Sequence, residues 1–146
     1  MSTYPAVGDL VPHESPMLAL DEVVFAELGR ATSRVTLREG MPFVVDGCLE
    51  TVVTLEYMAQ TVAACLRLES LELDNESPVR IGMVVACRSM TIHRPELRVG
   101  EVLYCEVKRL RGTAEASLFE GRTRDASDAV VSEVSMTLVH AEMAPG

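Results

Sequence analysis

The sequence predicts one α+β domain, spanning residues 1–146, in which a curved antiparallel sheet of about five to six strands wraps one long buried helix. Three observations predict this fold class. A chain of 146 residues is the size of one ordinary domain with a sizeable core. Its one helical pattern is apolar almost all round, which is typical of a buried helix. Stretches that favour β-structure stand before and after that pattern.

Two strands are predicted before the helix. The stretch Pro16–Leu28 is rich in apolar and β-branched residues and ends before a glycine. The stretch Arg34–Arg38 alternates, with Val35 and Leu37 on one face. Residues 40–47 contain glycine, proline and aspartate, so we expect a loop there.

The helix is predicted from about Leu49 to Leu68. Its opposite side is apolar as well, so we expect it to be buried. The polar run Glu69–Pro78 then ends the helix as a solvated loop. The apolar residues with i, i+3, i+4 spacing are Val52, Val53, Met58, Ala59, Val62, Ala63 and Leu66.

Four strands are predicted after the helix, and we expect them to form a meander. The last alternates most clearly, with Val134, Met136 and Leu138 on one face. Because such a sheet leaves an edge open, pairing with a second copy is expected. The four stretches are Arg80–His93, Glu101–Leu110, Ala114–Arg122 and Ala129–His140.

Composition excludes several classes of protein. The net charge of −9 disfavours a nucleic-acid binder. No apolar run is long enough to span a bilayer, and the N-terminus lacks the pattern of a signal peptide. Widely spaced cysteines without a CxxC pair indicate reduced thiols in a cytoplasmic protein, with no metal site. Arginines gather in the second half of the chain, where they suit phosphate or are ordinary solvated residues of strands. The cysteines are Cys48, Cys65, Cys87 and Cys105.

One acid interrupts the apolar helix. Glu56 and Gln60 are i, i+4 neighbours on one face. Burial would raise the pKa of such a carboxyl group, which suits a general acid or base lining a pocket. A structural hydrogen-bond acceptor, or a side chain pointing outward at the helix end, fits the pattern equally. Periodicity alone does not choose between these interpretations.

Three ordered motifs resemble the hotdog-fold 3-hydroxyacyl-acyl carrier protein dehydratases. They are "LVPHESPMLALDEVV" (Leu10–Val24), "LEYMAQTVAA" (Leu55–Ala64) and "HRPELRVGEVLYCEV" (His93–Val107). The resemblance covers most of the chain and implies the hotdog fold. It also implies removal of water from a 3-hydroxyacyl thioester, in which Glu56 helps the hydroxyl group leave.

The chain departs from that family in the segment before the helix. The family's His-Phe-Pro-Gly motif, whose histidine removes the α-proton across the dimer interface, is absent between Phe43 and Glu56. The stretch "MPFVVDG", together with "LEYMAQ", is similar to a short-loop branch that accompanies aryl polyene pathways. The resemblance therefore leaves the proton-abstracting residue unidentified.

Several residues are candidates for the missing base. His13 either acts in catalysis or fixes its loop by hydrogen bonds, and Glu56 either acts alone or acts with Asp46. Asp46 is expected foremost to cap the helix. His93 is expected in a solvated turn, and His140 on the surface.

Further residues are assigned to substrate binding. The backbone N–H groups of Gly47 and Cys48, expected at the helix N-terminus, would face the thioester carbonyl as an oxyanion hole, although a turn alone also explains the glycine. Apolar residues would line an acyl tunnel, or simply form the core. The tunnel candidates are Met17, Val53, Met58, Gln60, Met83 and Met90.

Three functions remain open: a dehydratase, an acyl thioesterase, and a non-catalytic subunit that completes the site of an active paralogue. The substrate would be an acyl thioester on phosphopantetheine, with no other cofactor. If an acyl carrier protein holds it, Arg94, Arg98 and Lys108 are expected to form the docking patch. A homodimer, a larger hotdog assembly or a heterodimer with a paralogue is expected.

Overall fold

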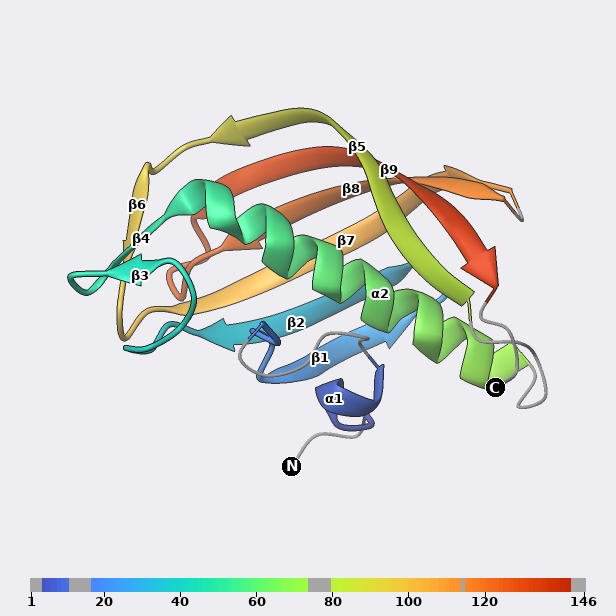
Figure 1. Cartoon of the computed structure of the whole chain (residues 1–146), viewed down its shortest axis with the longest axis horizontal. Coiled ribbons are helices and arrows are strands. Elements are labelled where there is room, and N and C mark those ends of the chain that lie inside the picture. The colour runs from blue at the N-terminus through green and yellow to red at the C-terminus, as the bar shows by residue number, and fades with distance from the viewer. Residues whose placement is uncertain (1–3, 11–16, 74–79, 114, 143–146) are drawn as a thin grey trace.

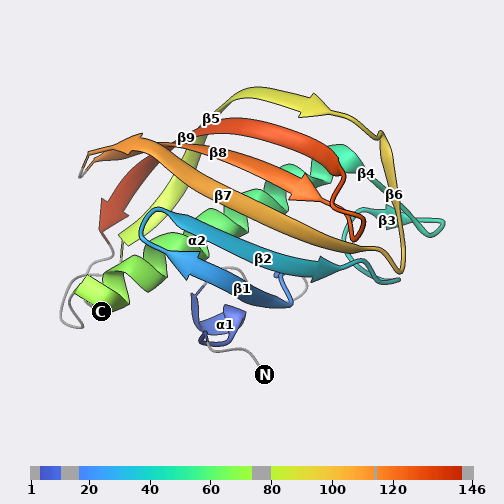
Figure 2. The ribbon, with the colours of Figure 1, turned by 180° about the vertical axis from the view of Figure 1, so that it is seen from behind.

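The computed structural model describes residues 4–10, 17–73, 80–113 and 115–142, without the side chains of 72–73, 80–85 and 140–142. A six-stranded sheet curves around one long helix, α2 (Thr54–Leu73), and leaves the other side of that helix uncovered by strands (Figure 1). Seen from behind, the strands lie across the helix as one continuous layer (Figure 2). This is the predicted hotdog arrangement.

The sheet is antiparallel throughout, in the order β1-β2-β7-β8-β9-β5. Its inner face is apolar because side chains alternate along each strand. On β9, Val134, Met136 and Leu138 are buried as predicted, and so are Val35 and Leu37. The strands are β1 (Glu22–Glu27), β2 (Arg30–Thr36), β5 (Arg80–Ile92), β7 (Val102–Gly112), β8 (Ala116–Arg124) and β9 (Val130–Glu142).

A smaller three-stranded sheet takes in residues from both sides of the helix in the chain. The sequence predicts a loop over residues 40–47 and a helix from about Leu49, but Cys48–Glu50 form a strand and the helix begins at Thr54. The small sheet consists of β3 (Val44–Val45), β4 (Cys48–Glu50) and β6 (Glu96–Arg98). A 3₁₀ turn, Thr51–Val53, connects it to α2. A four-residue helix, α1 (Val7–Leu10), lies near the N-terminus.

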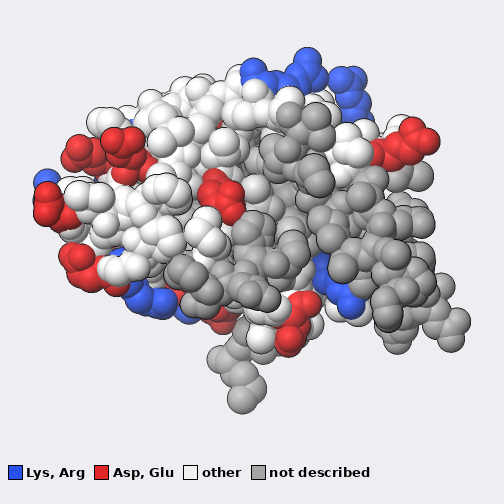
Figure 3. Space-filling view, in the orientation of Figure 1, with Lys and Arg blue, Asp and Glu red and all other residues white. Residues whose placement is uncertain are grey.

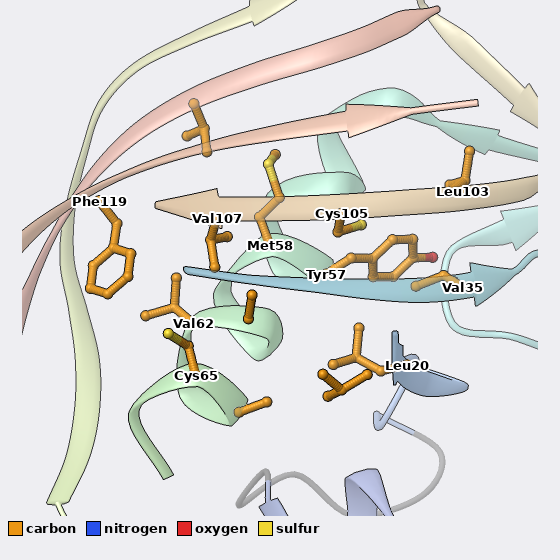
Figure 4. Close-up of a cluster of buried hydrophobic side chains, with 14 of the residues drawn as sticks. Leu20, Val35, Tyr57, Met58, Val62, Cys65, Leu103, Cys105, Val107 and Phe119 are labelled. Carbon is orange, nitrogen blue, oxygen red and sulfur yellow. The ribbon is translucent and has the colours of Figure 1, made fainter. Parts of the chain in front are cut away.

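The core fills the space between α2 and the inner face of the sheet. Figure 4 shows Met58, Val62 and Cys65 on the helix together with Phe119 and Leu103 from the strands. All five side chains are buried. The contact is close at Gly121 of β8, where a Cβ atom would lie 2.8 Å from the sulfur of Met58.

Three predicted segments differ from the structure. The strand predicted over Pro16–Leu28 begins only at Glu22, because the backbone at Met17 and Ala19 bonds to a helix side chain instead of a strand. The predicted four-strand meander is wrong. Only β7, β8 and β9 are consecutive neighbours, and β5 pairs with the far side of β9.

The predicted end of the helix at Leu68 is also wrong, because Glu69 belongs to the folded core. Its carboxylate accepts hydrogen bonds from the Gly29 N–H and from Arg109 Nη2, both at 2.6 Å. Arg109 also lies over the Phe119 ring, 5.4 Å from its centroid. A charged pair this well hydrogen-bonded can be partly buried, so the helix continues past the predicted loop boundary.

The two edges of the large sheet differ. On β1, the Ala26 N–H donates to the Tyr4 hydroxyl at 2.9 Å, so the N-terminal segment covers this edge. On β5, no described strand pairs with the outer edge. The side chains of residues 86–89 on that strand are exposed. An uncovered edge strand is a template for pairing with another chain.

Candidate active site

Glu56 lies in the first turn of α2 and is half-buried. Gln60 Nε2 donates to Glu56 Oε1 at 3.2 Å. The same nitrogen donates to the Met17 carbonyl at 2.8 Å, and the Ala19 N–H donates to Gln60 Oε1 at 3.0 Å. Gln60 has no exposed surface, so its amide is fixed by all three bonds. It therefore holds one carboxylate oxygen of Glu56 in place.

The turn that carries Glu56 is anchored to the strands. The hydroxyl groups of Thr54 and Ser132 are 2.7 Å apart, which joins the start of α2 to β9. The Thr51 hydroxyl donates to the carbonyl of Arg94. Side chains locked by such contacts are what a preorganised catalytic group requires.

Tyr57 follows Glu56 and points toward the sheet, between Val35 and Cys105 (Figure 4). Burial is the main cause that raises the pKa of Tyr57 to about 12, and the nearby Cys105 and Glu56 groups contribute to the rise. Its hydroxyl group has no hydrogen-bond partner within the described part of the chain. Tyr57 therefore stays protonated at neutral pH and gives the helix start a low-polarity neighbour.

A cavity of about 420 Å³ opens beside the start of α2. Val53, one helical turn before Glu56, lines it, together with Cys48 and Glu50 of β4. Phe43 and Val45 also line it, and both are more than half exposed. The volume lies in the range of small-molecule sites.

Gly47 and Cys48 line a hairpin and do not lie at the helix N-terminus, so their predicted placement is wrong. Asp46 (φ 52°) and Gly47 (φ 74°) form the two-residue turn between β3 and β4, in which both residues have positive φ. Strand β4 and the 3₁₀ turn separate this hairpin from Thr54. Asp46 is therefore a turn residue and not the helix cap. Glu50 occupies the N-cap position of the 3₁₀ turn that leads into α2, without a side-chain capping bond. An oxyanion role for Gly47 and Cys48 stays a prediction. Its one point of support is that Cys48 lines the cavity.

The predicted tunnel residues separate into groups. Met58 has no exposed surface and packs in the core, because it lies about 200° around the helix from Glu56. Met17 is 42% exposed, while Met90 packs partly buried against the core from β5. The side chain of Met83 lies outside the described residues. Val53 and Gln60 remain on the Glu56 face.

The histidines do not supply an evident base within the described residues. His93 is exposed, and its Nε2 lies 2.9 Å from Glu133 Oε2, which agrees with the predicted solvated turn. This hydrogen bond is the main cause of a lowered pKa of Glu133, to which Arg122 contributes. His13 and the side chain of His140 lie outside the described residues.

The predicted carrier-docking residues do not form one patch. Arg94 is paired with Glu101, and its Nη1 lies 3.8 Å from Asp125 Oδ2, so its charge is offset locally. Lys108, on β7, lies opposite Arg30. It is six residues from Val102, at the end of the strand near Arg94, so the two ends are roughly 20 Å apart. Figure 3 shows basic side chains at separate places on the rim of the α2 side. Arg98 is exposed and contacts Glu101 through its backbone: its N–H donates to Glu101 Oε2, and its carbonyl accepts from the Glu101 N–H.

Comparison with known proteins settles the family. A model of the ApeP-like family, described as ApeP dehydratase, matches residues 5–144. The chain belongs to the ApeP-like dehydratases. No curated protein matches it in a sequence search. None of the described helices is long and apolar enough to span a membrane.

Solved structures support the fold of this ApeP-like chain. The dehydratase heterocomplex ApeI:P from Xenorhabdus doucetiae matches with a TM-score of 0.82 at 24% identity, over 97% of this chain and 93% of that one. A hypothetical thioesterase with coenzyme A from Streptococcus pneumoniae matches at 0.65 and 11%, over 84% and 86%. The PaaI protein of E. coli, from the phenylacetic acid degradation operon, matches at 0.65 and 10%, over 81% of each chain.

Proposed function

We propose that this ApeP-like dehydratase removes water from a 3-hydroxyacyl thioester, with Glu56 as the acid that protonates the departing hydroxyl group. The observation that carries the assignment is the Gln60 clamp, which fixes one oxygen of the half-buried Glu56, one helical turn after the cavity residue Val53. A fixed acid at the edge of an apolar helix suits proton transfer to a leaving group.

The elimination needs two proton transfers. A base takes the proton from the carbon next to the thioester, and the bond from the β-carbon to the hydroxyl oxygen breaks. Glu56 gives a proton to that oxygen, which leaves as water. Since His93 is engaged by Glu133, we assign the base to His13 or to a second subunit.

The proposed partner is a second hotdog subunit, paired along β5. Support comes from the uncovered outer edge of β5 and from the similarity to one chain of a dehydratase heterocomplex. The thioester would be carried on phosphopantetheine, free or on an acyl carrier protein, in an aryl polyene-type or fatty-acid pathway. A homodimer is the alternative assembly.

The test is mass spectrometry of a 3-hydroxyacyl carrier-protein thioester incubated with the purified chain, alone and with a co-purified hotdog partner. Loss of one water is expected, and Glu56→Gln should reduce the rate about 10²–10⁴-fold. The matched control is Glu120→Gln, a half-buried glutamate on the outer face of β8. Equal rates for wild type and Glu56→Gln would refute the role of Glu56.

Because the histidine motif is absent, a second function is also proposed: the chain is a non-catalytic subunit of an active pair. In that case the co-purified pair should release water whether glutamate or glutamine stands at position 56, and the chain alone should release none. Release of free acid in place of water would instead identify a thioesterase.

A further inference from the structure

A second cavity, of about 310 Å³, lies on the outer face of the sheet, away from α2. Leu118 of β8 and Thr137 of β9 line its middle. They alternate with the buried Phe119 and Met136, which face the core, so their own side chains point outward. Arg88 and Arg111 also line the cavity, from β5 and β7. Because β5 and β7 flank the β8–β9 pair, the two arginines approach one space from opposite sides.

Both arginines are placed by irregularities in the strands. The pairing of β5 with β9 shifts register between Cys87 and Ser89, so Arg88 is the extra residue. The pairing of β7 with β8 shifts between Arg109 and Arg111, directly before the second arginine. Bulges of this kind re-aim side chains and are common beside functional sites.

No described acidic residue neutralises either arginine, although the chain carries a net charge of −9. Within the described part of the chain, Arg88 and Arg111 have no ion pair, and no acidic residue lines their cavity. Arg67 and Arg98 also have no ion pair among the described residues, but neither lines this cavity. The other arginines with described side chains have acidic partners within 4 Å: Arg30, Arg34, Arg38, Arg94, Arg109, Arg122 and Arg124. Two unpaired guanidinium groups over one cavity form a site for an anion.

We propose that Arg88 and Arg111 bind the phosphate group of a phosphopantetheine arm. Guanidinium groups match phosphate oxygens with paired, charge-assisted hydrogen bonds. The apolar lining at Leu118 suits the uncharged part of the arm next to the phosphate. This inference rests on the proposed function, because it assumes a thioester substrate carried on that arm.

The position of Arg88 connects this site to the assembly. Arg88 lies on β5, the strand whose outer edge no described strand covers. Pairing through the backbone of β5 would leave side chains on the outer face free. The phosphate site would then lie at the junction between two subunits, where an arm can enter the active site of either one.

The experiment compares 4′-phosphopantetheine with pantetheine, which differ only in the phosphate, by backbone-amide NMR titration of the full chain. We expect the wild type to bind the phosphorylated compound at least about tenfold more tightly, with shifts at residues 111–118 and 137. Arg88→Gln and Arg111→Gln should each lose most of this preference. Arg30→Gln, an outer-face arginine already paired with Glu27, should keep it.

An equal preference in all four proteins, or no preference in the wild type, would overturn the proposal, as would shifts confined to other strands. Titration with acyl-free carrier protein bearing phosphopantetheine gives a further comparison. A loss in the two variants for the free arm and for the carrier-bound arm alike would support a phosphate contact. Because this readout needs no turnover, its failure is distinct from a failure of Glu56 to act in dehydration.

Discussion

Replacing Gln60 with methionine keeps the length of a fully buried side chain and removes its amide. Two hydrogen bonds to the backbone of Met17 and Ala19 are lost, together with one to the Glu56 carboxylate. Neutral hydrogen bonds contribute about 1 kcal/mol each, and bonds to a charged group about 1.5–3 kcal/mol. The expected loss in the free energy of unfolding is therefore about 3–5 kcal/mol.

The assay is urea denaturation followed by circular dichroism, at one fixed protein concentration because assembly adds to stability. The matched control is Thr61→Val, which removes a buried hydroxyl group that bonds only within the helix, to the carbonyl of Tyr57 at 2.8 Å. It should cost about 1 kcal/mol. If Gln60→Met costs no more than Thr61→Val, the clamp does not hold the N-terminal segment. A dehydration rate that survives in a folded Gln60→Met protein would show that Glu56 needs no positioning.

Two predictions concern the core. Gly121→Ala should destabilise the fold by about 1–3 kcal/mol in urea denaturation, because the new Cβ atom meets the sulfur of Met58 at 2.8 Å. Combined with Met58→Ala it should cost less than the sum of the two single changes, and full additivity would contradict the contact. Burial raises the pKa of Cys65 and Cys105 to about 12, so a thiol reagent at pH 8 should label these residues only after denaturation. The unfolded thiols ionise near pH 9, so stability should be complete below that value and fall as the pH rises toward 12; a flat profile would contradict this.

The pattern of apolar residues predicts the layers of this fold well, because it reports burial directly. Alternation along β9 identifies its buried face, and the all-round apolar pattern identifies α2 as the central helix. The pairing of β5 with β9 has no such signal, because it depends on which segments the curved sheet brings together. The end of the helix is missed for a similar reason: Glu69 is solvated in any local interpretation, and only the fold brings Arg109 to it.

The small sheet before the helix did have a local signal. Asp46-Gly47, with Val44 and Val45 before it and Cys48 after it, is the residue pair that a two-residue hairpin turn prefers. The expectation that Gly47 and Cys48 lie at the helix N-terminus puts the helix start one strand and one 3₁₀ turn too early. The hairpin instead forms one wall of the cavity that Val53 lines.

The site itself was predictable only in part. Helical spacing places Gln60 next to Glu56, but the other two bonds of Gln60 go to backbone atoms more than forty positions away, and backbone atoms leave no trace in the sequence. The sequence predicts that Arg94 is free to dock a carrier protein, because Glu101 and Asp125 approach its charge only in the folded chain. Sequence counts charges, whereas docking depends on the charges that remain unpaired.

The sequence offers a set of arginines that suit phosphate, and the same distinction explains why only the structure selects Arg88 and Arg111 from it. Each follows or forms a bulge, and a register shift cannot be read from the identity of the residue that is displaced. Without the bulge after Arg109, the strict alternation of β7 would turn Arg111 toward the inner face of the sheet. In our proposal the sheet separates two tasks: its inner side and α2 hold the carboxyl group that transfers a proton, and its outer side holds two guanidinium groups that have no ion pair among the described residues. A substrate that uses both sites would pass the edge of the sheet at β5, which no described strand covers.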